Sequence, residues 1–124
     1  MIRIVRRGGA AVVGAVAAVA LASSASPASA TSGPTFVENW DARCLTSGNV
    51  CVHDSAYFNG RTALYEDVDT ECVTVPFGVL AAINMTDGPV RFYATTDCTG
   101  RSYVEPAENF HSWLDAGPRY SFRM

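Results

Sequence analysis

A Gly-Arg pair followed by Thr or Ser occurs at two places in the chain, 40 residues apart. Residues 59–62 read Asn-Gly-Arg-Thr, and residues 99–102 read Thr-Gly-Arg-Ser. Glycine adopts a positive φ without the steric cost that a side chain imposes. We therefore predict that Gly60 and Gly100 each lie in a structural turn, where a hairpin folds back. Because the dipeptides Asn-Gly and Thr-Gly are common in turns, the two tetrapeptides alone do not establish a repeat.

The residue types around the two turns follow the same order. Each half begins with a β-prone run, at 51–54 or 91–94, and continues through a polar loop to the glycine. A second β-prone run follows, at 62–65 or 102–104, and then an acidic loop and a last apolar run. This order predicts one four-strand unit that occurs twice.

Helix signals are nearly absent after residue 35. Four prolines after residue 75 divide the chain into short pieces that are rich in Thr, Val, Tyr and Phe. The competing interpretations are a helix that begins within 77–84 and a single helical turn at 108–114. We therefore predict an all-β sandwich of two Greek-key units packed face to face, in which the last strand of each unit returns beside its first.

The first 30 residues are predicted to be a secretion signal peptide. A basic start at Arg3, Arg6 and Arg7 precedes an apolar stretch, 10–22, that is too short to span a bilayer, and Ala28-Ser29-Ala30 offers small residues for cleavage. We expect a secreted, extracellular protein with no stable membrane insertion after cleavage. The rest divides into a segment of uncertain order, 31–43, and one domain, 44–124.

The predicted mature chain is small, and its cysteines indicate disulfide bonds. Removal of the signal leaves 94 of the 124 residues, which is only just enough for a stable core. An even number of cysteines in an exported chain predicts two disulfides among Cys44, Cys51, Cys72 and Cys98. Three pairings are possible, and the residues alone do not choose among them. The spacing does not favour zinc, which needs closer ligand pairs.

Charge and motif content argue against several classes of function. Three of the nine basic residues lie in the predicted signal, which leaves six arginines against 12 acids, so we expect no nucleic-acid partner. No Gly-x-Ser-x-Gly elbow occurs, and His53 in a strand and His111 in a loop have no evident catalytic partners, so we expect no enzyme and no cofactor. The acidic run Glu66–Glu71 is expected to be a solvated loop, with weak calcium binding left open.

Two stretches of the chain carry a family resemblance. They are CLTSGNVCVHDSAYFNGRT, residues 44–62, and VRFYATTDCTGRSY, residues 90–103. They resemble small secreted actinobacterial proteins of the βγ-crystallin superfamily, the group that includes the Streptomyces metalloproteinase inhibitor. The resemblance implies a βγ-crystallin-like, disulfide-stabilised sandwich. The positions that bind calcium in that superfamily correspond here to 76–77 and 116–117, which offer almost no oxygen ligands, so we expect no strong calcium site.

The resemblance also favours one disulfide pairing. In the superfamily pattern an aromatic residue stands two positions before the turn glycine, as Phe58 does, whereas the second half has Cys98 there. A cysteine at that position would point inward, which suggests a buried disulfide partner. With the resemblance in view, we favour a Cys44–Cys51 bond that closes a short loop and a Cys72–Cys98 bond that links the two units.

The resemblance implies that the chain inhibits an extracellular protease, which would be its partner. A rigid loop of the chain would enter the active-site cleft of that protease. A loop that is already ordered loses little entropy on binding. The candidate inhibitory loops comprise Leu45, Thr46, Ser47, Gly48, Asn49 and Val50 in the first half, and Ala94, Thr95, Thr96, Asp97 and Thr99 in the second. The alternative is a non-inhibitory extracellular module with a structural or antagonistic role.

Overall fold

The structure is a computed structural model that describes residues 31–113 and 116–124. The signal peptide predicted for residues 1–30 lies outside the described residues. Within them, the regular structure is almost entirely β-strand, as the scarcity of helix signals predicted, and no helix is long and apolar enough to cross a bilayer. The elements are β1 (Ser32–Val37), the 3-10 helix η2 (Ala42–Leu45), β2 (Val50–His53), β3 (Thr62–Glu66), β4 (Val73–Val79), β5 (Ala81–Asn84), β6 (Val90–Tyr93), β7 (Ser102–Glu105), β8 (Asn109–Ser112) and β9 (Arg119–Arg123).

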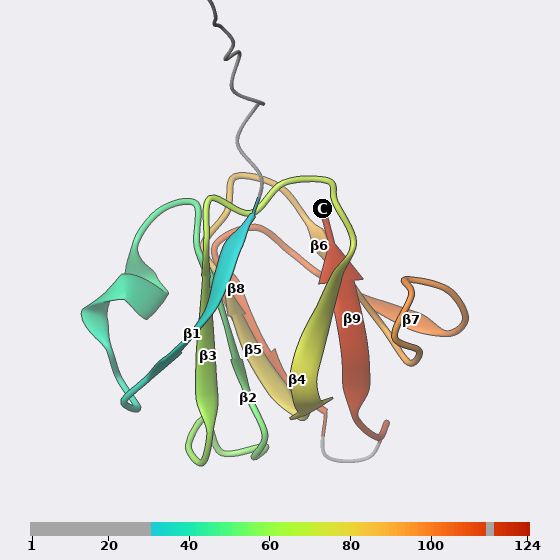
Figure 1. Cartoon of the computed structure of the whole chain (residues 1–124), viewed down its shortest axis with the longest axis horizontal. Coiled ribbons are helices and arrows are strands. Elements are labelled where there is room, and N and C mark those ends of the chain that lie inside the picture. The colour runs from blue at the N-terminus through green and yellow to red at the C-terminus, as the bar shows by residue number, and fades with distance from the viewer. Residues whose placement is uncertain (1–30, 114–115) are drawn as a thin grey trace, which may run out of the picture.

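The strands form two antiparallel sheets (Figure 1). The five-stranded sheet has the order β1-β3-β2-β5-β8, and the four-stranded sheet has the order β4-β9-β6-β7. In both predicted units the last strand lies beside the first, because β5 pairs with β2 and β9 pairs with β6. The strands β6 and β7 begin 40 residues after β2 and β3, so the predicted offset is present in the structure.

Each unit places its third strand in the other sheet. The strand β4 of the first unit pairs with β9, and β8 of the second unit pairs with β5. The sheets therefore differ from the expected stacking of one whole unit on the other. Strand β4 alternates so that Val75, Phe77 and Val79 are buried while Thr74 and Pro76 are exposed, and this alternation suits a strand with one face on the core.

The two glycine turns have the same backbone conformation. Gly60 and Gly100 have φ of 76° and 80°, and the residues two positions earlier, Phe58 and Cys98, have φ of 60° and 59°. Positive φ values recur at the same offset, which explains why glycine occurs at both turns. At Gly60 the backbone also approaches the carboxylate of Asp54 so closely that a Cβ would collide with it.

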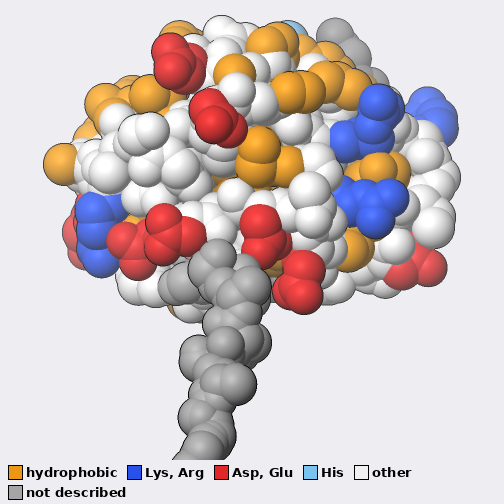
Figure 2. Space-filling model, turned by 90° about the horizontal axis from the view of Figure 1, so that it is seen from above, with side chains coloured by type: hydrophobic (Ala, Val, Ile, Leu, Met, Phe, Trp, Pro, Cys, Tyr) orange, Lys and Arg blue, Asp and Glu red, His pale blue; other side chains and the backbone are white. Residues whose placement is uncertain are grey.

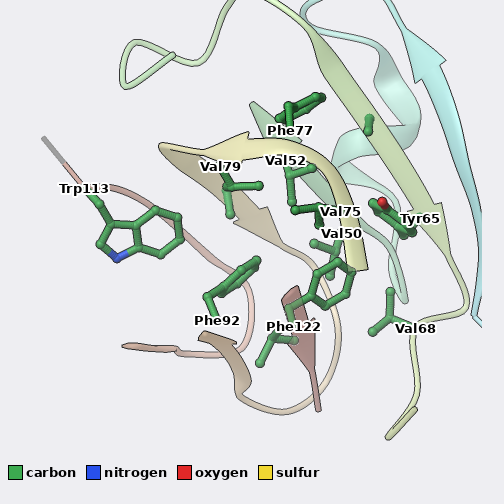
Figure 3. Packing of buried hydrophobic residues seen from close by; sticks show 13 residues of the cluster. Val50, Val52, Tyr65, Val68, Val75, Phe77, Val79, Phe92, Trp113 and Phe122 are labelled. Atoms are coloured by element: carbon green, nitrogen blue, oxygen red, sulfur yellow. The ribbon is translucent and has the colours of Figure 1, made fainter. Parts of the chain in front are cut away.

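The core lies between the two sheets (Figure 3). Both sheets contribute valines and aromatic residues to it, and Phe122 lies at its centre, with ring centroids 5.1 Å from Tyr65 and 5.3 Å from Phe92. Trp113 packs on Phe92 at 5.2 Å. Rings at these distances with tilted or edge-on planes add favourable aromatic contacts to the burial of apolar area.

Two sequence alternatives and one uncertain segment are decided by the structure. Within 77–84, where a helix was an alternative, residues 77–79 belong to β4 and 81–84 to β5, and residues 109–112 form β8 rather than a helical turn. His111 therefore lies in a strand, and its predicted place in a loop is wrong. The segment of uncertain order contains β1, which pairs with β3 at the edge of the sheet.

Candidate functional site

Two disulfides tie the chain at its loops. Cys44 is bonded to Cys51, and Cys72 is bonded to Cys98, which is the pairing favoured by the resemblance. No free cysteine occurs among the residues that the structure describes, so these thiols are not zinc ligands. Disulfides persist in oxidising compartments, and two of them in so small a domain indicate an extracellular or similar environment.

The first candidate inhibitory loop projects from the side of the five-stranded sheet (left in Figure 1). Leu45, Thr46 and Ser47 are exposed, whereas Asn49 and Val50 are buried. Val50 is the first residue of β2 and is fully buried. The predicted loop is therefore too long at its C-terminal end, because its last two residues already face the protein interior and could not contact a partner.

Hydrogen bonds hold this loop in one conformation. The Asp41 carboxylate accepts from the backbone N–H of Arg43 at 2.9 Å and pairs with the Arg43 guanidinium. The Asn49 amide donates to the Arg43 carbonyl at 3.0 Å, and the loop is tied to the end of β5 by the N–H of Gly48, which donates to the Met85 carbonyl. Together with the disulfide, these bonds give a backbone that needs little further ordering on binding.

An apolar groove lies beside the same loop, and the sequence analysis did not find it. The groove has a volume of about 270 Å³ and is lined by Trp40, Leu45, Phe58, Ile83 and Phe110. Trp40 is 78% exposed, Phe110 is 65% exposed and Leu45 is 64% exposed. A cluster of large, solvent-exposed apolar side chains is typical of an interaction site, whereas a single exposed apolar side chain is common on protein surfaces.

The elements that build the groove are far apart in sequence. Trp40 precedes η2 and Leu45 is its last residue. Phe58 belongs to the first turn, and Ile83 and Phe110 come from the paired strands β5 and β8. The Phe58 ring meets Phe110 edge-on at 5.5 Å. No periodicity of the sequence links these positions, so only the exchange of β8 into this sheet brings them together.

The second candidate loop, 94–99, is exposed but polar. The Thr95 hydroxyl lies 2.8 Å from the Asp97 carboxylate and 2.7 Å from the Thr99 carbonyl. Thr74 and Ser121 donate to the carbonyls of residues 96 and 95, respectively. Hydrogen bonds to Thr99 and Thr95 hold the pKa of the Asp97 carboxyl below its usual value. Hydrogen bonds hold this loop in place, but it offers no large apolar side chain to a partner.

His53 is buried, and its ring packs edge-on against Phe58 of the apolar groove with centroids 5.5 Å apart. Its Nδ1 lies 3.0 Å from the Thr62 hydroxyl, and that hydroxyl donates to Asn39 Oδ1 at 2.8 Å. Since the hydroxyl has only one hydrogen, Nδ1 must donate and Nε2 carries the lone pair. Nε2 is buried and has no partner within the described chain. Burial therefore lowers the pKa of His53 to about 4, although the nearby Asp54 raises it slightly.

We expect the stability of the protein to fall between pH 7 and pH 4.5 because of His53. The unfolded chain takes up a proton near pH 6.5, whereas the folded protein does so only near pH 4. The free energy of unfolding is thus highest above pH 6.5 and decreases as the pH falls towards 4. At pH 4.5 it is lower by about 2.5 kcal/mol. Urea unfolding at both pH values measures the loss, and His53→Gln should lose less over the same interval. Equal losses in the two proteins would contradict this assignment.

The other polar residues considered for chemistry are dispersed. The His111 ring stacks on Tyr103 with centroids 4.6 Å apart. In the acidic run Glu66–Glu71, the Asp69 carboxylate accepts from the Thr31 hydroxyl and from the N–H of Glu71. No cluster of three or more His, Cys, Asp or Glu side chains suited to a metal ion occurs in residues 31–113 and 116–124.

No protein-family model, curated protein or solved structure matches this chain. The functional interpretation therefore depends on the geometry of the loops and surfaces. The sequence found the loop after Cys44 but not the groove beside it. The one indication of the groove in the sequence is Trp40, a large apolar residue in a polar, turn-prone stretch where exposure is expected.

Proposed function

We propose that this chain is a secreted binding protein that inhibits an extracellular protease with the loop around Leu45. The observation that carries the proposal is an exposed leucine on a fixed backbone: Leu45 directly follows the buried, disulfide-bonded Cys44 and is 64% exposed. A protease cleft takes up apolar side chains along an ordered strand or loop. A segment that is ordered beforehand binds there without a large entropic cost.

The groove beside Leu45 supports a partner of substantial size. Trp40 stands at its edge, and aromatic side chains of this kind contribute strongly to protein–protein binding because they bury a large area with few rotatable bonds. The groove wall consists of apolar side chains, so it would accept an apolar residue from the rim of the cleft. The metalloprotease class is the one that the resemblance implies.

The alternative is a non-inhibitory, βγ-crystallin-like extracellular module. The doubled unit supports it, because the last strand of each unit lies beside its first and the third strands are exchanged between the sheets. Such an arrangement is compatible with two Greek-key units. In this alternative the exposed residues around Leu45 have no protease partner.

The test is an inhibition assay with the purified mature domain. We expect a thermolysin-type metalloprotease to lose activity on a fluorogenic peptide at micromolar inhibitor, with a panel of serine proteases run in parallel. Leu45→Ala should raise the inhibition constant at least about tenfold, as expected for a central contact residue. Circular dichroism of each variant checks that it is folded.

Thr96→Ala is the matched control, because Thr96 is exposed on the other candidate loop. It should change the inhibition constant less than about twofold. A loss of inhibition by Thr96→Ala but not by Leu45→Ala would assign the contact to the second loop. No inhibition of any protease in the panel would remove the inhibitor proposal and leave the non-inhibitory module.

A further inference from the structure

The outer face of the four-stranded sheet carries two arginines directly opposite each other. Arg91 on β6 and Arg123 on β9 are register partners in the antiparallel pair, and both are exposed. Side chains at such positions are close neighbours, and like charges directly opposite each other destabilise the sheet. The arrangement therefore calls for an explanation beyond the folding of the sheet.

The repeat shows what occupies the equivalent place in the other sheet. Three residues in adjacent strands form a row on each outer face, and each member of one row is 40 positions from a member of the other. On the five-stranded sheet the row is Leu64, Cys51 and Ile83. On the four-stranded sheet it is Val104, Arg91 and Arg123.

Another segment of the chain packs over the row on the five-stranded sheet, whereas the row on the four-stranded sheet is exposed to solvent. On the five-stranded sheet, Cys44 packs against the row through its disulfide and forms a buried apolar cluster with it. On the four-stranded sheet, the row lines a pocket of about 280 Å³. The second unit has no counterpart of the η2 segment among the described residues, so its row is free to contact something other than the chain.

The arginines of the two units also differ in their partners. The described residues contain two ion pairs, at 2.9 and 2.8 Å, and neither belongs to the second unit: Arg43 pairs with Asp41 in the segment before the first unit, and Arg61 pairs with Asp54 in the first unit. The position equivalent to Asp54 in the second unit is Ala94, so the acid of that ion pair has no counterpart. In Figure 2 most of the visible basic side chains lie at the right, beside apolar ones, whereas another basic side chain lies at the left next to acidic ones.

Among the residues that the structure describes, no acid forms an ion pair with Arg91 or Arg123. Nη1 of Arg91 donates to the Ser102 hydroxyl at 2.9 Å, and no carboxylate of the described chain lies within ion-pair distance of either guanidinium. The acid of β7, Glu105, is completely buried and accepts from the Asn109 amide at 2.7 Å. Most of the N–H donors of the two guanidinium groups are thus available to a ligand.

The rest of the pocket defines the kind of anion that fits. Tyr93 forms one wall, and Pro89, Val104 and Met124 provide apolar surface around the two arginines. A guanidinium group binds carboxylate or phosphate oxygens through charge-assisted, often paired hydrogen bonds. An anion placed between the two groups would turn their mutual repulsion into attraction to a shared partner, while its apolar body lies against the pocket walls.

We propose that the pocket between Arg91 and Arg123 binds a small organic anion, in which a carboxylate or phosphate group is attached to an apolar or aromatic body. The two arginines hold the anionic group, and Tyr93 with Val104 contacts the body. The site lies on the sheet opposite to the Leu45 loop, and it does not depend on the proposed inhibition of a protease.

The test is an NMR titration of the ¹⁵N-labelled mature domain with benzoate, phenyl phosphate and inorganic phosphate. We expect saturable shifts at β6 and β9 with a dissociation constant on the order of 1 mM for the better aromatic anion. The comparison of benzoate with phenyl phosphate identifies the preferred anionic group. Both should bind at least about fivefold more tightly than inorganic phosphate, because only they contact the apolar walls.

Three variants decide whether the two arginines form the site. Arg91→Gln and Arg123→Gln should each weaken binding about tenfold, because each removes charge-assisted bonds. Arg101→Gln removes an exposed arginine that does not line the pocket, and it should change the affinity less than about twofold. An equal loss in Arg101→Gln, unsaturable shifts, or equal affinity for phosphate and the aromatic anions would each overturn the proposal.

Discussion

Replacement of Asn84 by alanine should lower the free energy of unfolding by about 4 kcal/mol. The Asn84 side chain is fully buried, and its amide nitrogen lies 2.9–3.0 Å from the carbonyls of Gly88, Glu105 and Pro106. Its Oδ1 accepts from both the N–H and the hydroxyl of Thr86. Alanine would leave several of these buried groups without a partner and create a cavity, which explains the large effect.

Urea unfolding monitored by circular dichroism measures this loss, and Asn59→Ala is the matched control. Asn59 is an exposed asparagine in the first glycine turn, and we expect its replacement to change stability by less than about 1 kcal/mol. Similar losses in the two variants would contradict the role assigned to the Asn84 network.

The burial of Asn84 also means that the Asn-Met-Thr sequence at 84–86 is not an accessible glycosylation acceptor in the folded protein.

Removal of the Cys72–Cys98 disulfide by a double replacement with alanine should cost about 3.5 kcal/mol. The bond joins residues 26 positions apart and links the start of β4 to the loop between β6 and β7. It therefore restricts the unfolded chain more than the Cys44–Cys51 bond, which joins residues 7 positions apart and should be worth about 2.4 kcal/mol.

Thermal and urea unfolding of the two double variants tests this order. The Cys44→Ala/Cys51→Ala protein should keep the sandwich with a smaller loss of stability but should lose the fixed conformation of the Leu45 loop. If the variant without the short-range bond is the less stable of the two, chain entropy does not explain the contribution of these bonds, and packing of the buried Cys44 and Cys51 would account for it.

The local structure of the positions in the predicted site followed from the sequence at some residues and not at others. The turn conformations at Gly60 and Gly100 follow from the steric freedom of glycine and were predictable residue by residue. The exposure of Leu45 and the burial of Asn49 were not, although both lie in one short loop. Asn49 is buried because the loop returns to hydrogen-bond with Met85, which is distant in sequence.

The edge strand β1 shows a second limit of sequence reasoning. Residues 32–37 contain Gly33 and Pro34, which are unfavourable in a strand interior, and they lack a regular alternation of apolar and polar residues. They form a strand because β3 offers an unpaired edge, with which Thr35, Phe36 and Val37 are in register. A partner strand elsewhere in the chain, rather than the segment itself, decides this structure.

The sequence by itself determined the all-β character, the 40-residue repeat and the positions of its glycine turns, since these depend on backbone preferences and on patterns within a few residues. Only the tertiary structure decided the exchange of β4 and β8, the apolar groove beside Leu45 and the juxtaposition of Arg91 with Arg123. These features join residues that are far apart along the chain. Their proximity depends on which strands pair and on how the two sheets bury their apolar faces, and no local pattern contains that information.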